Sequence, residues 1–258
     1  LRSRGLGDVY KRQINIEDDK IEILDAAPYI GMMSEKIDEE LKKVHPDCSV
    51  LNIGPAGEHL SLLAAIMNDK DRAAGRSGVG AVMGSKNLKA ITVTATKKVI
   101  PAADEEALKA ATKECNRKIK ENGVTGGGLP TYGTAVLVNI INNTGSFPTR
   151  NWQESYYEPA DDTSGETLKE KYLVKNAACH RCPIGCGRVI KVGDKVVGGP
   201  EYEPLWAYGG NCGINDLEAI DEANMWCNEY GLDAISTPCT IAAVSYTHLR
   251  AHETGAYL

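Results

Sequence analysis

The run Cys179-His-Arg-Cys-Pro-Ile-Gly-Cys186 brings three cysteines, Cys179, Cys182 and Cys186, into one short segment. Cysteine sulfur is the usual ligand of iron–sulfur clusters, and short spacers allow one loop to present three thiolates to one cluster. The intervening proline and glycine favour a loop conformation. The spacing therefore predicts an iron–sulfur cluster and electron transfer. A zinc-stabilised interaction module that also uses His180 is the distant alternative, because zinc sites usually show paired C-x2-C units.

A second run, residues 72–89, combines four cations with four glycines: Arg72, Arg76, Lys86 and Lys89 with Gly75, Gly78, Gly80 and Gly84. Glycine allows backbone N–H groups to approach an oxyanion closely, and arginine binds phosphate through two parallel hydrogen bonds. Two common nucleotide-binding patterns do not fit, because residues 78–84 are one residue too long for G-x-G-x-x-G and no G-x-x-x-x-G-K-[ST] occurs. The run predicts a phosphate site; a surface loop with solvated charges is the alternative.

Two further segments carry polar residues that could serve a redox centre. The segment Gly-Pro-Glu201-Tyr-Glu203 holds carboxylates at positions i and i+2, which point to one side of an extended chain. A carboxylate near a redox centre can move protons, whereas a solvated acidic turn is the alternative. The second segment, residues 228–237, begins at a predicted helix end, where Gly231 fits a left-handed C-terminal position.

The composition is that of an ordinary globular protein. The chain has 258 residues, of which 42% are hydrophobic and 25% charged, and a formal net charge of −6. We expect a cytoplasmic protein without a membrane span, because no stretch approaches the roughly 20 apolar residues of such a span and no secretory segment is visible. The acidic balance argues against nucleic acid as a partner. Cys212, Cys227 and Cys239 are expected to be buried rather than disulfide-bonded.

The two ends differ in character from the remainder. Residues 1–13 lack an initiator methionine and an apolar period, and they resemble translated sequencing-adapter sequence, as do residues 245–254. We therefore interpret residues 1–13 and 245–258 as non-native segments and exclude them from the reasoning about fold and function. The remainder is then expected to be an internal fragment of a longer protein.

The remaining residues predict an α+β fold. In the first part we expect a β-hairpin around residues 17–20, a helix over 34–44 capped by Ser34, a strand over 49–53, a helix over 56–68 and a strand over 88–94. Further on we expect helices over 104–120 and 131–142, a hinge or linker at 126–128, a hairpin over 189–197 and a helix capped by Asp216. Residues 14–98 are thus interpreted as the end of a β-rich cofactor-binding domain, and residues 99–244 as a mainly α-helical domain that carries the cysteine loop.

Five motifs occur here in the order found in a known family. They are Ile53-Gly-Pro-Ala-Gly-Glu58, the arginine–glycine run of residues 72–90, the cysteine loop, Gly-Pro-Glu-Tyr-Glu203 and Tyr-Gly-Leu-Asp233. Together they resemble the tungsten-containing aldehyde:ferredoxin oxidoreductase family over residues 14–244. In that family two phosphate-bearing pterins chelate tungsten, or molybdenum in some members, and a 4Fe-4S cluster passes electrons to ferredoxin. The resemblance therefore implies a tungstopterin or molybdopterin and a 4Fe-4S cluster as cofactors.

The resemblance also assigns roles to individual residues. The positions that match pterin contacts are Arg72, Ala73, Gly75, Arg76, Leu232 and Asp233, and Asn228 stands where the family has an acidic residue. Cys179, Cys182 and Cys186 match three cluster ligands, and the fourth lies beyond residue 245 in the family. Glu203 matches an acidic residue near the metal, with Glu201 as a close alternative.

The implied reaction is the oxidation of an aldehyde to a carboxylate, with two electrons passed to ferredoxin or a similar carrier. The implied partners are a small aldehyde substrate and that carrier, and a homodimer is compatible with the resemblance. The fragment by itself is expected to be inactive. The same scaffold acting on another substrate, by reduction of aromatic thioesters or oxidation of hydroxy acids, is the alternative. Residues 147–157, which are rich in aromatics, could line the substrate pocket or form a core patch.

Overall fold

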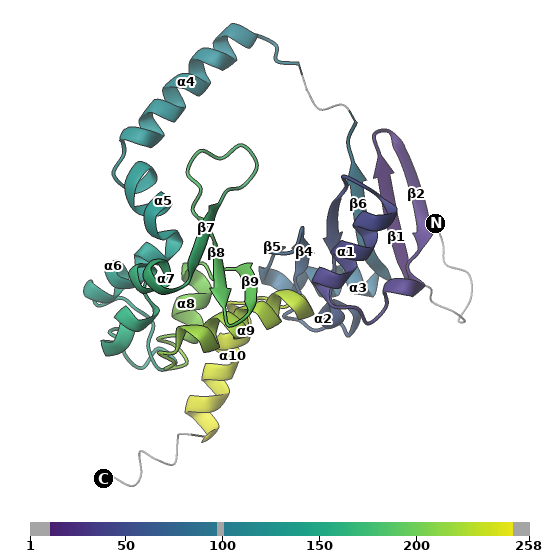
Figure 1. The fold of residues 1–258 in the computed structure, drawn as a ribbon. Coiled ribbons are helices and arrows are strands. Elements are labelled where there is room, and N and C mark those ends of the chain that lie inside the picture. Colours follow the sequence, from purple (N-terminus) through teal and green to yellow (C-terminus); the bar gives the residue numbers. More distant parts are fainter. Residues whose placement is uncertain (1–10, 97–100, 250–258) are drawn as a thin grey trace. The chain divides into compact units, whose positions relative to one another are not determined.

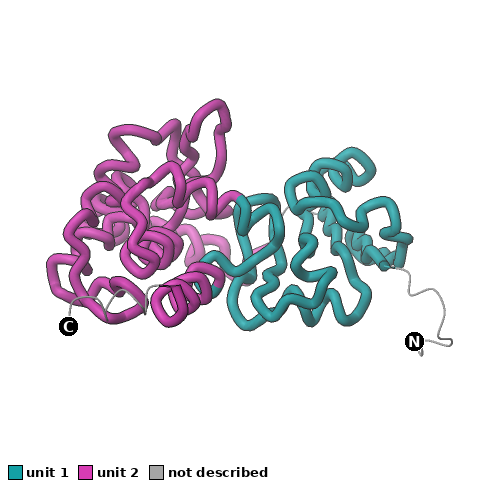
Figure 2. The backbone as a smooth tube through the Cα atoms, turned by 90° about the horizontal axis from the view of Figure 1, so that it is seen from below, with its two compact units in different colours: residues 1–100, 226–236 teal, residues 101–225, 237–258 magenta. Residues whose placement is uncertain are grey.

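The computed structural model describes residues 11–96 and 101–249 of the chain. The chain divides into two compact units, which Figure 2 shows in different colours. Unit 1 comprises residues 1–100 and 226–236, and unit 2 comprises residues 101–225 and 237–258. Unit 1 thus includes a short segment from late in the chain, and this segment contains Asn228, Leu232 and Asp233. The domain bounds expected from the sequence stay a prediction.

A six-stranded mixed sheet lies in unit 1 (Figure 1). Its strands are β1 (Arg12–Glu17), β2 (Lys20–Asp25), β3 (Ser49–Asn52), β4 (Ile66–Asn68), β5 (Arg72–Ala74) and β6 (Leu88–Thr94). Their order is β2-β1-β6-β3-β4-β5, with β1 parallel to β6 and all other neighbours antiparallel. The predicted hairpin is confirmed, since Ile16 of β1 lies opposite Ile21 of β2. β5 is an edge strand, and Arg72 begins it.

The described helices that accompany this sheet in residues 11–96 are α1 (Ser34–Val44), α2 (Pro55–Glu58) and α3 (Val79–Ser85), together with 3-10 turns at Ala27–Tyr29 and Arg76–Gly78. α1 buries Ile37 and Leu41, which lie one helical turn apart, against Val50 of β3 and Ala90 of β6. This apolar cluster fixes α1 on the sheet (Figure 1).

The predicted helix over residues 34–44 forms, but the predicted cap is wrong. Met33 occupies the N-cap position, and the Ser34 hydroxyl donates a hydrogen bond of 2.8 Å to the Asn52 side-chain oxygen instead. Both side chains are buried, so this hydrogen bond connects the start of α1 to the end of β3.

The predicted helix over residues 56–68 is also wrong. Only α2 forms, because Leu60 adopts a positive φ of 58° and turns the chain out of the helix. The apolar residues that suggested a helix include Met67, which lies fully buried in β4 and pairs with Asn52 of β3. Pairing with the sheet therefore outweighs the helical spacing of the apolar residues.

Unit 2 is mainly helical and contains a three-stranded antiparallel sheet of order β7-β8-β9. Its α-helices are α4 (Glu105–Glu121), α5 (Leu129–Tyr132), α6 (Leu137–Asn143), α7 (Gly165–Lys171), α8 (Tyr202–Tyr208), the larger part of α9 (Leu217–Tyr230), and α10 (Ser236–Val244). Its strands are β7 (Leu173–Ala177), β8 (Gly187–Val192) and β9 (Lys195–Gly198), and shorter turns span Val124–Gly128, Thr134–Val136, Glu158–Thr163 and Ser245–Leu249. β8 and β9 confirm the predicted hairpin. Because each unit combines α-helices with a β-sheet, the predicted α+β class is confirmed.

After residue 100, the sequence predicts the helix N-caps correctly but does not predict the effect of the glycines on the helices. The Asp104 carboxylate accepts a 2.9 Å hydrogen bond from the Ala107 backbone N–H and caps α4, and Asp216 caps α9 in the same way. Residues 126–128, expected to form a hinge or linker, lie in a π-helical turn between α4 and α5, and their role as a hinge or linker stays a prediction. Gly133, with a φ of 69°, interrupts the predicted helix over residues 131–142.

The described parts of the two chain ends take part in the fold. Gln13 of β1 is buried and donates a 3.1 Å hydrogen bond to the Thr92 hydroxyl. Tyr246 packs with Cys212 and Ala242 in a core cluster of unit 2. The interpretation of residues 1–13 and 245–258 as non-native stays a prediction, and residues 1–10 and 250–258 lie outside the described part. The described helices include none with the length and apolarity needed to cross a membrane.

Candidate cofactor-binding sites

Arg72 and Ala73 lie on the exposed edge strand β5 of unit 1. A turn with positive φ at Asp69 and Lys70 joins β4 to β5, and Asn68 pairs with Arg72 across the two strands. All three residues of β5 are exposed to solvent. The strand therefore presents the beginning of the arginine–glycine run at the surface of the unit.

The segment after α9, residues 231–236, is held in unit 1 by backbone hydrogen bonds. Gly231 has a φ of 69°, which confirms the predicted left-handed helix end, and its carbonyl accepts a 2.8 Å hydrogen bond from the Ala65 N–H. The Asp233 N–H donates a 2.8 Å hydrogen bond to the Leu63 carbonyl. At the same place a Cβ atom on Gly54 would lie 2.3 Å from the carbonyl oxygen of Tyr230. Glycine at position 54 is thus required by the close approach of the two segments.

These connections bring Arg76 and Gly75 beside Asp233. The Arg76 Nε atom lies 3.8 Å from Asp233 Oδ2, and a Cβ atom on Gly75 would lie 3.9 Å from Asp233 Oδ1. The Asp233 side chain is 4% exposed, whereas that of Arg76 is 68% exposed. Because the buried carboxylate holds only one edge of the guanidinium, the remaining N–H donors stay accessible to a phosphate.

Leu232 and Asn228 lie in the same segment. The Leu232 N–H donates a 2.7 Å hydrogen bond to the Cys227 carbonyl, and Leu232 forms an isolated β-bridge with Ala64. The Asn228 carbonyl accepts a 3.2 Å hydrogen bond from the Gly231 N–H. The predicted contacts of these two side chains with a cofactor stay predictions.

Lys89, one of the four cations of the run, has a different role from the one that the sequence suggested. Its side chain is fully buried, forms an ion pair with Glu58 and donates a 2.6 Å hydrogen bond to the Ile53 carbonyl. Glu58 in turn accepts hydrogen bonds from the Gly31 N–H at 3.0 and 3.1 Å. Burial lowers the pKa of Lys89, and the hydrogen bond and charge of Glu58 oppose this effect. Lys89 therefore stabilises the segment before Gly54 and does not face a phosphate in solvent.

The cysteine loop of unit 2 connects β7 to β8. Its first turn is closed by a 3.0 Å hydrogen bond from the Cys182 N–H to the Cys179 carbonyl. Cys179 is exposed, and Cys182 and Cys186 are half-buried. Burial raises the pKa of the Cys186 thiol, with smaller contributions from Glu201 and from the other two cysteines, so the three sulfurs influence one another electrostatically.

The donor chemistry of this loop fits an iron–sulfur cluster in part. Three thiols on one short loop are the expected ligands of such a cluster, which takes four. Within residues 11–96 and 101–249, however, no three His, Cys, Asp or Glu side chains converge as the ligands of a metal ion would. Cys212 and Cys227 are buried, as predicted, and Cys239 is half-buried. The loop itself offers three of the four ligands that such a cluster takes.

Arg188, which the sequence reasoning missed, holds the base of the cysteine loop. Its guanidinium donates hydrogen bonds to the carbonyls of Leu129, Gly185 and Gly187 at 2.7, 3.4 and 3.2 Å. It also donates one to the Asn176 side chain, while its own Nε is buried without a hydrogen-bond partner in the described part of the chain. The residue is 4% exposed, and burial lowers its pKa. An arginine two positions after the last cysteine was the available signal in the sequence.

Glu201 and Glu203 lie at the start of α8 and have different surroundings. Glu201 is half-buried and accepts a 2.5 Å hydrogen bond from the Thr134 hydroxyl, which itself accepts a 2.9 Å hydrogen bond from the Tyr202 N–H. Glu203 is exposed and accepts a hydrogen bond from the Trp206 indole N–H. The expected extended geometry is wrong, because α8 begins at Tyr202 and rotates Glu203 away from the direction of an i, i+2 pair.

The aromatic segment of residues 147–157 lies only partly in the core. Phe147 and Tyr157 are buried, whereas Trp152 is 66% exposed. Trp152 contacts Trp206 edge to face, with ring centroids 5.8 Å apart. The burial of Phe147 and Tyr157 favours the core interpretation for these two residues. A role in lining the substrate pocket stays a prediction for Trp152.

Unit 2 presents three cysteines on one loop, and unit 1 presents the Arg76–Asp233 pair beside Gly75. Such features are expected of a redox protein that binds metal and phosphate groups. Comparison with known families agrees. Residues 9–95 match the family model described as "Aldehyde ferredoxin oxidoreductase, N-terminal domain", and residues 110–250 match "Aldehyde ferredoxin oxidoreductase, domains 2 & 3". The chain therefore belongs to the aldehyde ferredoxin oxidoreductase family.

Individual relatives agree with this assignment. The chain is 52% identical to a tungsten-containing aldehyde ferredoxin oxidoreductase of Thermococcus kodakarensis, over 89% of this chain and 38% of the relative. It is 50% identical to the protein of the same name from Pyrococcus furiosus, over 93% of this chain and 40% of the relative. Among solved structures it resembles the active site complex BamBC of benzoyl coenzyme A reductase in complex with 1,5-dienoyl-CoA, with a TM-score of 0.72 and 25% identity over 92% of this chain and 38% of that chain. The chain thus spans about two fifths of the length of these proteins.

Proposed function

We propose that this chain is part of an oxidoreductase that oxidises aldehydes to carboxylates and passes the electrons to ferredoxin. The observation that carries the proposal is the identity of about one half, over about nine tenths of this chain, with relatives named for that activity. The implied cofactors are a tungstopterin, or a molybdopterin, and a 4Fe-4S cluster. When bound, the metal–pterin centre supplies two-electron oxidation, and the cluster supplies one-electron transfer to the acceptor.

In unit 1 the residues of this chain would hold the phosphate end of the pterin. Arg72 and Arg76 would donate hydrogen bonds to phosphate oxygens, and Gly75 would allow the backbone to approach them. Asp233 would orient the Arg76 guanidinium through the contact described above and keep an acceptor for N–H groups of the pterin ring. The exposure of the Arg76 side chain supports this role.

In unit 2 Cys179, Cys182 and Cys186 would supply three thiolates to the cluster, and Arg188 would hold the loop that carries them. Glu203 would accept a proton from the substrate or from water at a carboxylate oxygen, with Glu201 as the alternative base. Both carboxylates belong to the segment that begins α8, and Glu201 contributes to the environment of the Cys186 thiol.

The test is anaerobic purification of the intact protein that contains this chain. We expect a brown protein with tungsten or molybdenum, about four iron atoms per chain, and reduction of ferredoxin or a viologen dye on addition of small aldehydes. A colourless protein that contains zinc and no iron would reject the proposal in favour of the interaction module.

One observation favours a second candidate on the same scaffold, namely the structural similarity to a benzoyl coenzyme A reductase. Aldehydes, hydroxy acids and aromatic thioesters should therefore be compared as substrates of the same preparation. The lower identity of 25% to the reductase, against 52% to an aldehyde ferredoxin oxidoreductase, favours aldehydes. A cytoplasmic location and a homodimer belong to this proposal, and gel filtration of the intact protein tests the second.

A further inference from the structure

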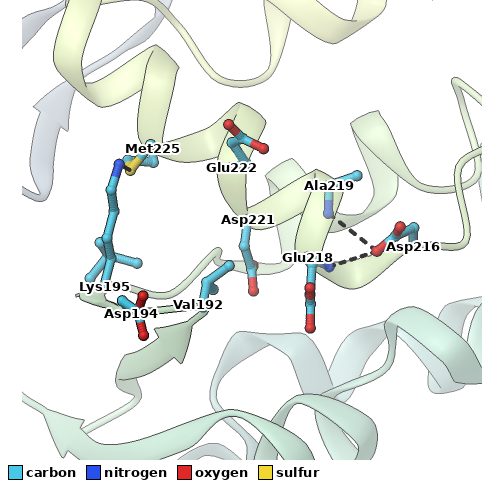
Figure 3. A pocket seen from close by; sticks show the side chains of 11 residues that line it. Val192, Asp194, Lys195, Asp216, Glu218, Ala219, Asp221, Glu222 and Met225 are labelled. Atoms are coloured by element: carbon cyan, nitrogen blue, oxygen red, sulfur yellow. Dashed lines mark hydrogen bonds between the residues drawn. The ribbon is translucent and has the colours of Figure 1, made fainter.

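A pocket of about 530 Å³ lies in unit 2 between the β8–β9 hairpin and the first part of α9 (Figure 3). Its size is in the range of pockets that bind small molecules. The hairpin contributes Val192, Asp194 and Lys195, and the helix contributes Glu218, Asp221 and Met225. The lining residues carry five carboxylates and one ammonium group, so the pocket is anionic.

Asp221 is the exceptional residue of this pocket. It is 1% exposed, and neither of its carboxylate oxygens has a hydrogen-bond partner among the described residues. Figure 3 shows its carboxylate pointing from α9 toward the hairpin. Burying an unpaired carboxylate is costly, and such groups in native proteins are normally paired or protonated. Burial, with a smaller contribution from Glu218, raises the pKa of Asp221 to about 8.

The charged and titratable neighbours do not neutralise Asp221. The Lys195 ammonium lies 3.8 Å from the Met225 sulfur, along the other wall of the pocket (Figure 3). Glu218 accepts a 3.3 Å hydrogen bond from the Tyr172 hydroxyl. Asp194 at the hairpin and Asp216 and Glu222 on the helix side are further anions of the lining, and Asp216 already accepts two backbone hydrogen bonds as the cap of α9.

We propose that this pocket binds an organic cation, an alkylammonium or guanidinium group that pairs with Asp221 while its carbon chain lies against Val192, Val197 and Met225. Carboxylates bind such cations by charge-assisted hydrogen bonds, and apolar walls suit the attached alkyl chain. A metal ion is the less suitable occupant, because no three potential ligands converge in the described part of the chain. The cation comes either from a free polyamine or from a lysine or arginine of the polypeptide outside residues 1–258. The proposal is independent of the redox activity.

The test uses the intact protein and two probes, 1,4-diaminobutane and its neutral analogue 1,4-butanediol, at constant ionic strength. Calorimetry compares the wild type with Asp221→Asn and with Glu106→Gln, which removes an exposed carboxylate of α4 instead. If a free polyamine is the occupant, the diamine binds to the wild type and to the control, and Asp221→Asn weakens binding at least tenfold. The diol does not bind. At pH 7 the heat of binding also depends on the ionisation enthalpy of the buffer, because a bound cation lowers the pKa of Asp221 and releases its proton.

If the cation belongs to the polypeptide, the diamine does not bind, and an experimental structure of the intact protein places a lysine or arginine nitrogen within about 4 Å of the Asp221 carboxylate. Either result supports the proposal. It is overturned if the diamine binds equally to the wild type and Asp221→Asn, or if the diamine does not bind and no such nitrogen lies beside Asp221. If Asp221→Asn does not fold, a structure of the wild type with bound diamine keeps the test decisive, because the proposal then requires a diamine nitrogen within about 4 Å of the Asp221 carboxylate.

Discussion

The guanidinium of Arg76 lies 3.8 Å from the carboxylate of Asp233, although most of the chain separates the two residues in sequence. The contact is asymmetric, because Asp233 is almost fully buried and Arg76 is largely exposed. Backbone hydrogen bonds from Ala65 and to Leu63 hold the segment of Asp233 in place. The buried carboxylate can therefore orient the exposed guanidinium of Arg76 toward a ligand.

We first predict that Arg76→Gln and Asp233→Asn lower the pterin and tungsten or molybdenum content of the purified intact protein, while its iron content is unchanged. Loss of a charge-assisted hydrogen bond of about 1.5–3 kcal/mol corresponds to roughly a 10- to 150-fold weaker affinity. Metal analysis and fluorescence of the oxidised pterin measure the effect. Arg117→Gln is the control, because Arg117 is also exposed and ion-paired but lies on α4. Full cofactor content in Arg76→Gln would contradict the proposed contact.

A second prediction concerns the buried ion pair of Lys89 and Glu58. Glu58→Gln removes the negative charge that compensates the fully buried Lys89 ammonium and leaves it with neutral acceptors such as the Ile53 carbonyl, which should destabilise unit 1 by roughly 3–5 kcal/mol. Lys43→Met, which removes an exposed ion pair with Glu40, should change stability by less than about 1 kcal/mol. Urea unfolding of the intact protein, followed for unit 1 by hydrogen exchange of β6, measures both.

The pH dependence of this pair has a definite sign. Burial lowers the pKa of Lys89 below its ordinary value of 10.5, so the unfolded chain binds more protons than the folded chain in the pH range between the two values. The contribution of Lys89 to stability therefore rises with pH in that range. Glu58→Gln removes the group that opposes this shift and should extend the rise toward lower pH. A stability of Glu58→Gln that falls between pH 8 and 10 would contradict the assignment.

Lys89 also shows where the sequence was informative and where it was not. Composition and spacing placed it correctly in a strand, but they could not show that its side chain turns inward to Glu58, a contact between residues far apart in sequence. Strand alternation and N-cap carboxylates depend on local geometry, and such signals predicted the β1–β2 hairpin and the cap of α4. The helix expected over residues 56–68 failed because pairing with β3, a tertiary contact, decides that segment. The buried and unpaired state of Asp221 likewise depends on the packing of the hairpin over α9.

The third prediction is that Arg188→Met makes the midpoint potential of the cluster more negative, by roughly tens of millivolts, because a buried positive charge near the cluster favours its reduced state. Arg188→Lys retains the charge but cannot reach the three carbonyls that the guanidinium bonds, so it should lower iron content with little change in potential. Arg181→Met removes an exposed charge from the same loop and should shift the potential less. Redox titration followed by electron paramagnetic resonance provides the comparison, and equal shifts for Arg188→Met and Arg181→Met would refute the buried role.

The fourth prediction distinguishes the proposed cluster ligands from the other cysteines. Cys182→Ser should reduce the iron content of the intact protein severely, because a hydroxyl is a much poorer ligand for iron than a thiolate. Cys115→Ser should have no effect, since Cys115 is exposed on α4 and far in sequence from the loop. Iron analysis and the visible absorption of the cluster report the result. Normal iron content in Cys182→Ser would exclude this thiol as a ligand.

The fifth prediction separates Glu203 from Glu201 as the group that accepts the proton. Glu203→Gln should lower kcat by roughly 100-fold or more and remove the acidic limb of the pH–rate profile, because a carboxamide cannot act as a base. Glu201→Gln should retain both that limb and the iron content, because the carboxamide oxygen can still accept the Thr134 hydrogen bond that connects Glu201 to the start of α8. The two variants are matched in volume and in charge lost, so steady-state kinetics from pH 5 to 9 and iron analysis assign the roles directly. An unchanged profile in Glu203→Gln with a lost limb in Glu201→Gln would transfer the role to Glu201, and an unchanged profile in both would remove it from this segment.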